Sequence, residues 1–192
     1  VAEFTAMAPN ATLRIVDGPH GYLTERLRLS ELDLVIGRLN EPHLMQGVSF
    51  TQLYTEEVAF VVRAEHPLVE DPVLSRIGAY QVIYPPVGAA IRPLVEPFMI
   101  SNAMGELLNR IETVSGAFGR VYTRHSDAVW IISSGVVANE VADGVLVRLP
   151  FDTALTAGPV GLMTRPDNSA TPATEVFRIA VQNVVQREGL SA

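Results

Sequence analysis

Residues 30–42 read SELDLVIGRLNEP, an apolar run that ends at a Gly-Arg pair and is followed by a turn. The near-continuous apolar residues of 32–37 predict a strand that is covered on both faces of a sheet. Arg38 stands at the carboxyl end of this strand, which is where open α/β sheets bind their ligands. The stretch therefore indicates an α/β fold. It also raises the question whether Arg38 contacts a ligand or only a carboxylate at the surface.

Strand and helix patterns alternate on both sides of this stretch. A strand, a helix and a strand in close succession imply parallel pairing with right-handed crossovers. Strands are predicted at 12–17, 32–37, 48–53, 57–63, 80–84, 111–115, 128–133, 145–150 and 158–165. Helices are predicted at 1–8, 22–29, over about ten residues from Ala89, at 116–125 and 135–142, and from Thr171 to Gly189.

This series of elements crosses twice between two α/β lobes. We expect the first lobe to contain residues 1–54 and 159–192 and the second lobe to contain residues 55–158. The crossings are expected near Tyr54 and Gly158. A ligand cleft would lie between the two lobes, lined by the turns that follow the strands.

The composition excludes several classes of site. The 192 residues contain no cysteine, and the four histidines are scattered, so we expect no disulfide, no metal site and no cofactor. All 14 basic residues are arginine, and the net charge is −7. An acidic chain without a basic cluster is a poor candidate for binding nucleic acid by itself.

The same composition bears on the location of the protein. No apolar run approaches the roughly 20 residues that a membrane-spanning helix needs. The first residues also lack the pattern of a signal peptide. We therefore expect a soluble, cytoplasmic protein.

Several segments, in this order and spacing, resemble the effector-binding domain of LysR-type transcriptional regulators. The resemblance covers essentially the whole chain. Within the family, the stretch from IETVS (111–115) to GPVGL (158–162) most resembles the regulators of protocatechuate catabolism or of sugar-binding-protein genes. The segments that carry it are Phe4, Pro9, LRIVDG (13–18), LRLSELDLVIGRL (27–39), EEVAFVVRAEHPL (56–68), RIETVS (110–115) and DAVWIISSGVVANEVADGVLVRLP (127–150).

The resemblance implies a fold and a set of partners. The fold is two Rossmann-like lobes joined by two crossover strands, similar to type 2 periplasmic binding proteins. The partners are a small-molecule effector, a second copy in a homodimer or homotetramer, and DNA. The family contacts DNA through an amino-terminal winged helix-turn-helix that this sequence does not include. The strand that precedes the first helix in the family, and whose loop commonly contacts the effector, is also missing from it.

Two residues of the first lobe are candidates for effector binding. Arg38 could hold a carboxylate with its two-pronged guanidinium, or could form a structural ion pair with Glu31, Glu41 or another carboxylate near the strand end. His20, at the start of a helix, could donate to a ligand oxygen or could simply end a solvated loop.

The candidates in the second lobe stand in strand-to-helix turns, where free N–H groups and a partial positive charge favour anions. Ser115 and Gly116 could equally be a plain helix cap, and Phe118 could be core. Trp130 is expected in the core. Arg92 could reach the cleft or water, and we expect it to face water. The effector-binding candidates of this lobe are Pro86, Val87, Gly88, Ser115, Gly116, Phe118 and Ser133.

No pattern in the chain indicates an enzyme. A nucleophile needs a base within hydrogen-bond reach, and His125-Ser126-Asp127 is better explained as a turn, since adjacent loop residues point in different directions. The sequence is therefore interpreted as the sensing and oligomerising domain of a LysR-type regulator. The alternative is a solute-binding protein of a transport system, which shares the two-lobed plan.

Overall fold

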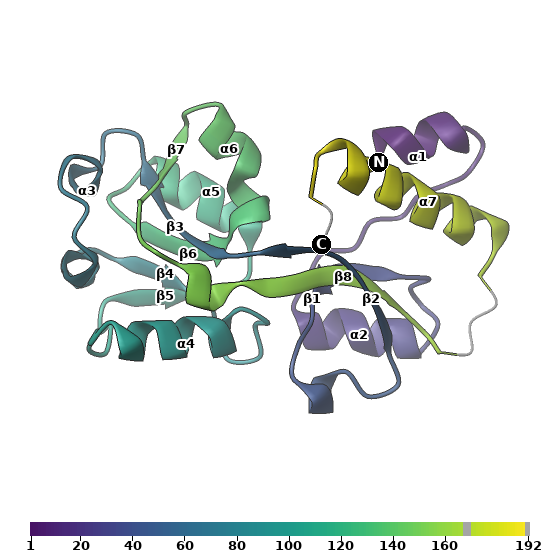
Figure 1. Cartoon of the computed structure of the whole chain (residues 1–192), viewed down its shortest axis with the longest axis horizontal. Helices are drawn as coiled ribbons and strands as arrows, with labels where there is room; N and C mark the ends of the chain where they lie inside the picture. Colours follow the sequence, from purple (N-terminus) through teal and green to yellow (C-terminus); the bar gives the residue numbers. More distant parts are fainter. Residues whose placement is uncertain (167–169, 191–192) are drawn as a thin grey trace. The chain divides into compact units, whose positions relative to one another are not determined.

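Two units divide the chain in the computed structural model, which describes residues 1–166 and 170–190. Unit 1 contains Val1–Thr55 and Gly158–Ala192, and unit 2 contains Glu56–Ala157. Each unit has its own sheet and its own helices, so the predicted α/β class is confirmed (Figure 1). Residues 167–169 and 191–192 of the expected first lobe lie outside the described residues.

The sheet of unit 2 has five strands in the order β5-β4-β6-β3-β7. β4 runs parallel to both β5 and β6, whereas β3 runs antiparallel to β6 and β7. The carboxyl ends of β5, β4 and β6 therefore lie at one edge of this sheet. The strands are β3 (Val58–Arg63), β4 (Val82–Tyr84), β5 (Arg110–Glu112), β6 (Val129–Ser133) and β7 (Leu146–Arg148).

The core of unit 2 lies on both faces of this sheet. Val58, Phe60 and Val62 of β3 are buried on one face, against α4 (Arg92–Ser101). Ala59 and Val61 alternate with them and are buried on the other face, against Trp130. The other elements of unit 2 are α3 (Pro67–Glu70), η2 (Leu74–Ala79), α5 (Gly116–Arg124), η3 (Ser134–Val137), α6 (Ala138–Ala142) and η4 (Ala154–Thr156). Figure 1 shows α4 on one face of the sheet and α5 and α6 on the other.

The sheet of unit 1 has three strands in the order β1-β8-β2, with β1 antiparallel to β8. One face is covered by α2, which packs Leu27 against Val35 and Met163, and the other by α7, which packs Val185 against Leu162. The elements of this sheet are β1 (Val35–Arg38), β2 (Ser49–Glu56), β8 (Gly158–Thr164), α2 (His20–Arg28), η1 (Pro42–Leu44) and α7 (Pro172–Arg187).

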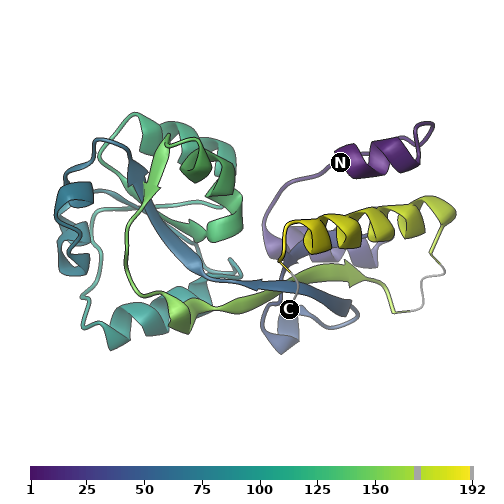
Figure 2. The same ribbon diagram turned by 45° about the horizontal axis from the view of Figure 1, so that its top comes forward.

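The first helix of the chain, α1 (Ala2–Met7), lies along α7 (Figure 2). The rings of Phe4 and Phe177 meet edge to face with centroids 5.3 Å apart. Arg187 donates to the Glu3 carboxylate at 2.9 Å. The amphipathic pattern of the first residues thus predicts this helix correctly, because its apolar side is buried against a second helix.

The prediction of a strand at 12–17 is wrong, because these residues form no ladder with any strand of the described chain. Alternating apolar residues favour an extended backbone, but a strand also needs a neighbour for its N–H and C=O groups.

Helix α4 begins at Arg92, three residues later than predicted. Among the described residues, no helix has the length and apolar character needed to cross a bilayer.

Candidate functional site

Three turns lie together at the edge of the unit 2 sheet where β5, β4 and β6 end. The turn after β4 leads into α4, the turn after β5 leads into α5, and the turn after β6 leads into η3. All seven candidates of the second lobe stand at the end of these strands, in the turns or in the first turn of the helices that follow. Because free N–H groups at helix starts carry partial positive charge, this edge suits an anion.

The turn after β4 is held by backbone and side-chain contacts. The N–H of Ala89 donates to the carbonyl of Pro86 at 3.1 Å, and Gly88 adopts a φ of +83°. A Cβ at this position would meet nothing within 4 Å, so crowding does not require a glycine here. The left-handed conformation does favour one. Val87 is exposed and free to contact a ligand. Arg92 donates from Nη1 to the carbonyl of Pro85 at 3.2 Å.

The expectation that Arg92 faces water is wrong. Its side chain is only 18% exposed, and it is paired with Glu96 at 2.7 Å and with Glu112 at 3.3 Å. The Glu96 hydrogen bond raises the pKa of Arg92, with burial opposing. Arg92 therefore fixes the start of α4 rather than waiting in solvent.

Ser115 caps the helix that follows β5. Its Oγ accepts from the N–H of Phe118 at 3.2 Å, and its own N–H donates to Thr113 Oγ1 at 3.0 Å. The cap is thus real, and the hydroxyl can still donate its proton outward. At Gly116, a Cβ would lie 2.9 Å from Nη1 of Arg120, so the glycine leaves room for that arginine.

The two aromatic candidates beside this helix differ in burial. Phe118 is 38% exposed and stacks on Tyr122 with ring centroids 5.1 Å apart. Trp130 is buried in the core, and its ring lies where a Cβ on Gly119 would stand. Of the two, only Phe118 offers a surface to a ligand.

The turn after β6 is contacted by a carboxylate that the sequence reasoning missed, that of Glu56 at the end of β2. Ser133 is buried at the end of the strand, and the N–H of Ser134 donates to the carbonyl of Glu57 at 3.0 Å. The N–H of Gly135 donates to Oε2 of Glu56 at 2.8 Å. Glu56 therefore occupies the start of η3.

Arg38 is the last residue of β1 in unit 1, and only 5% of it is exposed. The next residue, Leu39, donates its N–H to the carbonyl of Pro159 at 2.9 Å, so the strand end is fixed against β8. Glu31 is paired with Arg26, and Glu41 lies 3.7 Å from His43. A buried guanidinium is costly unless its charge is compensated, and Arg38 has such an interaction within the chain.

His20 is the first residue of α2, and its Nε2 is buried without a hydrogen-bond partner in the described structure. Burial lowers the pKa of His20, and the positive charge of Arg28 adds to the effect. The chain reverses between α2 and β1, and these two elements pack together. The start of α2 and the end of β1 therefore lie toward the same end of unit 1.

These features define a class of protein: an α/β binding domain with strand-end turns and no assembled catalytic group among its described residues. Residues 1–186 match the LysR substrate binding domain, and the chain belongs to that family. The chain is 50% identical over 184 residues to the HTH-type transcriptional regulator PcaQ of Agrobacterium fabrum, covering 95% of this chain and 59% of that protein. It is 29% identical to the uncharacterized HTH-type transcriptional regulator YdcI of Escherichia coli, covering 95% and 60%.

Solved structures show the same fold. The effector binding domain of QuiR in complex with shikimate matches with a TM-score of 0.75 at 16% identity, covering 97% of this chain and 88% of that one. The CcmR regulatory domain of Synechocystis PCC6803 in complex with 2-PG matches with a TM-score of 0.73 at 15% identity, covering 96% and 88%. The predicted two-lobed plan is thereby confirmed as the fold. The relatives are named as regulators and not as enzymes, in agreement with the sequence analysis.

Proposed function

We propose that this chain senses a small carboxylated metabolite, an aromatic catabolite or a sugar-derived acid, on behalf of a transcriptional regulator. The observation that carries this proposal is the buried guanidinium of Arg38 at the end of β1. A fixed guanidinium forms two parallel hydrogen bonds with a carboxylate, which provides both charge and orientation. Shikimate, bound by one domain of the same fold, is itself a carboxylate.

The two units contribute different groups to this proposal. Unit 1 supplies the charge through Arg38 and a neutral imidazole through His20. Unit 2 supplies N–H groups and hydroxyls from Pro86–Gly88, Ser115–Phe118 and Ser133.

Effector binding would act on transcription through the arrangement of the two units. A ligand shifts such an equilibrium only by its difference in affinity for the two arrangements. The chain spans about three-fifths of the length of the regulators that it matches. Contact with DNA through a winged helix-turn-helix domain, assembly as a homodimer or homotetramer, and a cytoplasmic location are further parts of this proposal.

Calorimetry against a panel of aromatic acids, muconates and sugar acids tests the proposal. Arg38→Ala is expected to raise the Kd of the most tightly bound carboxylate by about 10- to 100-fold. This factor corresponds to the free energy of a hydrogen bond to a charged group. Arg178→Ala is the matched control, because Arg178 is an exposed arginine of unit 1 whose one partner among the described residues is Glu175. If Arg38→Ala binds the carboxylate as tightly as the unchanged chain, Arg38 does not hold the effector.

Light scattering separates the regulator from the transport alternative. A solute-binding protein needs no oligomer, whereas the regulator is expected to form a dimer or a tetramer. Exposed apolar side chains on helices of both units, such as Met7, Val121 and Ile179, are available for such contacts. A monomer at every concentration tested would favour transport.

A further inference from the structure

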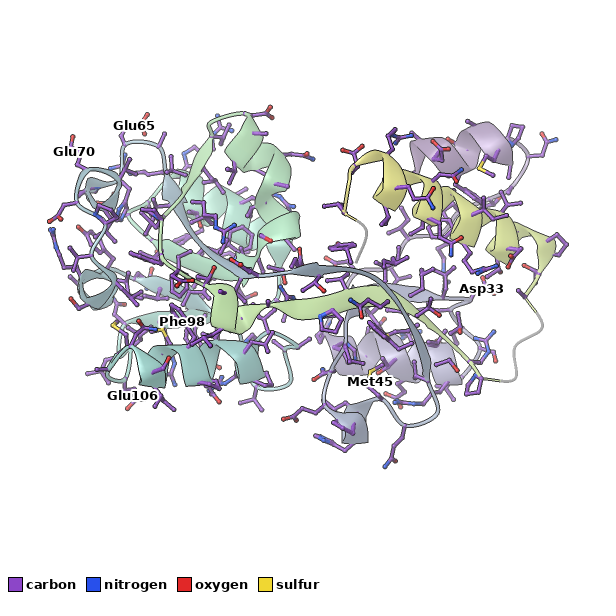
Figure 3. The ribbon with its side chains drawn as sticks, in the orientation of Figure 1. Asp33, Met45, Glu65, Glu70, Phe98 and Glu106 are labelled. Carbon is purple, nitrogen blue, oxygen red and sulfur yellow. The ribbon has the colours of Figure 1, made fainter. Side chains whose placement is uncertain are left out.

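Unit 2 contains a cavity of about 280 Å³ that none of the candidate effector residues lines. It lies between α4 and the loop that leads from α4 to β5. Met99, Met104 and Leu107 form apolar walls, and Tyr84 and two arginines form a polar wall. Figure 3 marks Glu106, which also lines the cavity, near the end of α4. The volume is just below the range of about 300–1,000 Å³ typical of ligand pockets, so it suits a single-ring molecule.

The polar wall is held in place by ion pairs. Arg92 and Arg110 both donate to Oε1 of Glu112, at 3.3 and 3.0 Å, and both guanidinium groups lie over the ring of Tyr84. Arg110 also donates to the carbonyl of Leu107 at 3.4 Å. The groups of this wall are therefore preorganised, which lowers the entropic cost of binding a ligand.

Each of the two guanidinium groups keeps donors for a ligand. The hydrogen bonds of Arg92 use Nε and Nη1, and those of Arg110 use the same two atoms. Within the described part of the chain, neither Nη2 donates to a protein acceptor. A guanidinium has five N–H donors, so a ligand acceptor can bind there without displacing a glutamate.

The charge around the cavity argues against an anion. Two arginines face three carboxylates, those of Glu96, Glu106 and Glu112. Burial raises the pKa of Tyr84, and the negative charge of Glu96 adds to the effect, so the phenol stays neutral. A negatively charged ligand would be repelled by the excess of carboxylates over guanidinium groups. A ligand with an uncharged polar group that both accepts and donates hydrogen bonds can bind to an arginine and a glutamate at once.

We propose that this cavity is a second small-molecule site, which takes an uncharged single-ring compound with an amide or hydroxyl head. The ring packs against the two methionines and Leu107, and the head accepts from Arg92 or Arg110 and donates to a glutamate. The site stands apart from the anion site of the proposed function and does not rest on it.

Benzamide, benzoate and benzamidine test the proposal because they share a ring and differ in the charge of the head. Methionine methyl NMR provides the readout, since the chain has five methionines and only Met99 and Met104 line the cavity. Met7, Met45 and Met163 of unit 1 serve as internal controls. Benzamide is expected to shift the Met99 and Met104 signals with a Kd on the order of 1 mM.

Charge and position are tested separately. Benzoate is expected to bind about tenfold more weakly than benzamide, and Glu106→Gln is expected to narrow that difference because one carboxylate is removed. Gly105→Leu should fill the cavity and abolish the shifts, since a Cβ at Gly105 meets nothing within 4 Å. Ala142→Leu, on the exposed side of α6, is the control and should leave them unchanged.

Three results would overturn the proposal. The first is the absence of any shift at Met99 and Met104 with benzamide at about ten times the expected Kd. The second is a shift that survives Gly105→Leu, which would place the probe elsewhere. The third is tighter binding of benzoate or benzamidine than of benzamide, which would show that a charged ligand fits better.

Discussion

Unit 2 and unit 1 use the same layered plan but bury very different amounts of apolar surface. In the described residues, the two faces of the unit 2 sheet carry clusters of fifteen and seven buried apolar side chains, and those of unit 1 carry three each. Unit 1 instead contains the buried charge of Arg38 and the buried imidazole nitrogen of His20. The comparison indicates that unit 2 has the larger apolar core, whereas the groups proposed to select a charged effector lie in unit 1.

Removal of the Phe60 ring from the core of unit 2 should show the difference in core size between the units most strongly. Phe60→Ala is expected to lower the free energy of unfolding of unit 2 by about 3–5 kcal/mol, because it leaves a cavity between two apolar layers. Val185→Ala in unit 1 is expected to cost about 2 kcal/mol. Urea denaturation with hydrogen exchange assigns each loss to its unit. Equal losses would contradict the difference in core size.

Two glycines sharpen the comparison. A Cβ on Gly161 of unit 1 would lie 2.3 Å from the backbone oxygen of Thr51, whereas one on Gly119 of unit 2 would lie 2.3 Å from the Trp130 ring. Gly161→Ala is expected to cost about 3 kcal/mol, since a backbone cannot move aside, and Gly119→Ala about 2 kcal/mol. Gly105→Ala has free space and is the control. Thermal unfolding that ranks Gly119→Ala as the worse variant would contradict this reasoning.

Acid should destabilise both units through one histidine each. Burial lowers the pKa of His66 and of His20 below the ordinary 6.5. The unfolded chain therefore binds protons more readily, so stability is complete above about pH 6.5 and falls as the pH is lowered below that value.

The two histidines can be separated by variants. At His66, Nδ1 accepts from the N–H of Leu68 at 3.0 Å, so Nε2 carries the proton and faces the carbonyl of Asp127 at 3.2 Å. His66→Asn should flatten the pH dependence of unit 2, and His20→Asn that of unit 1, when hydrogen exchange is followed from pH 7.5 to 5. If neither variant changes the pH dependence of stability, that dependence arises from other titratable groups.

Two helix caps provide the smallest effect and the cleanest control. Ser115→Ala in unit 2 and Thr171→Ala in unit 1 each remove a side-chain acceptor for a helix N–H, at 3.2 Å in both cases, and each should cost about 1 kcal/mol of stability. Only Ser115→Ala should also weaken effector binding, by a few fold. Equal affinity of the two variants in calorimetry would make Ser115 a cap and nothing more.

Most of the fold could be predicted from the sequence, because apolar periodicity reports burial directly. The run at 57–63 predicted a strand, which is β3, and Thr171 predicted the start of α7. The expected burial of both faces of the strand at 32–37 holds only in part, since Ile36 of β1 is exposed. The strand at 12–17 was wrong because pairing depends on a neighbour and not on the segment itself. Helix α3 was missed, although His66-Pro67 is a cap followed by proline at the first helical position.

The candidate site was predictable where local patterns decide it. Strand ends that precede a helix can be recognised in the sequence, and parallel pairing then brings Pro86–Gly88, Ser115 and Ser133 to one edge. The contact of Glu56 with Gly135 could not be predicted, because it joins residues 79 positions apart through tertiary structure. The same holds for the network around Arg92, which the sequence placed in water.

The most direct test of the account compares a carboxylate effector with its uncharged amide on the unchanged chain and on Arg38→Met. The methionine keeps the apolar stem and removes the charge. The account predicts that the unchanged chain prefers the carboxylate by about 10- to 100-fold and that Arg38→Met loses most of this preference. A variant that still prefers the carboxylate to the same degree would contradict the central claim that unit 1 supplies the charge that selects the effector.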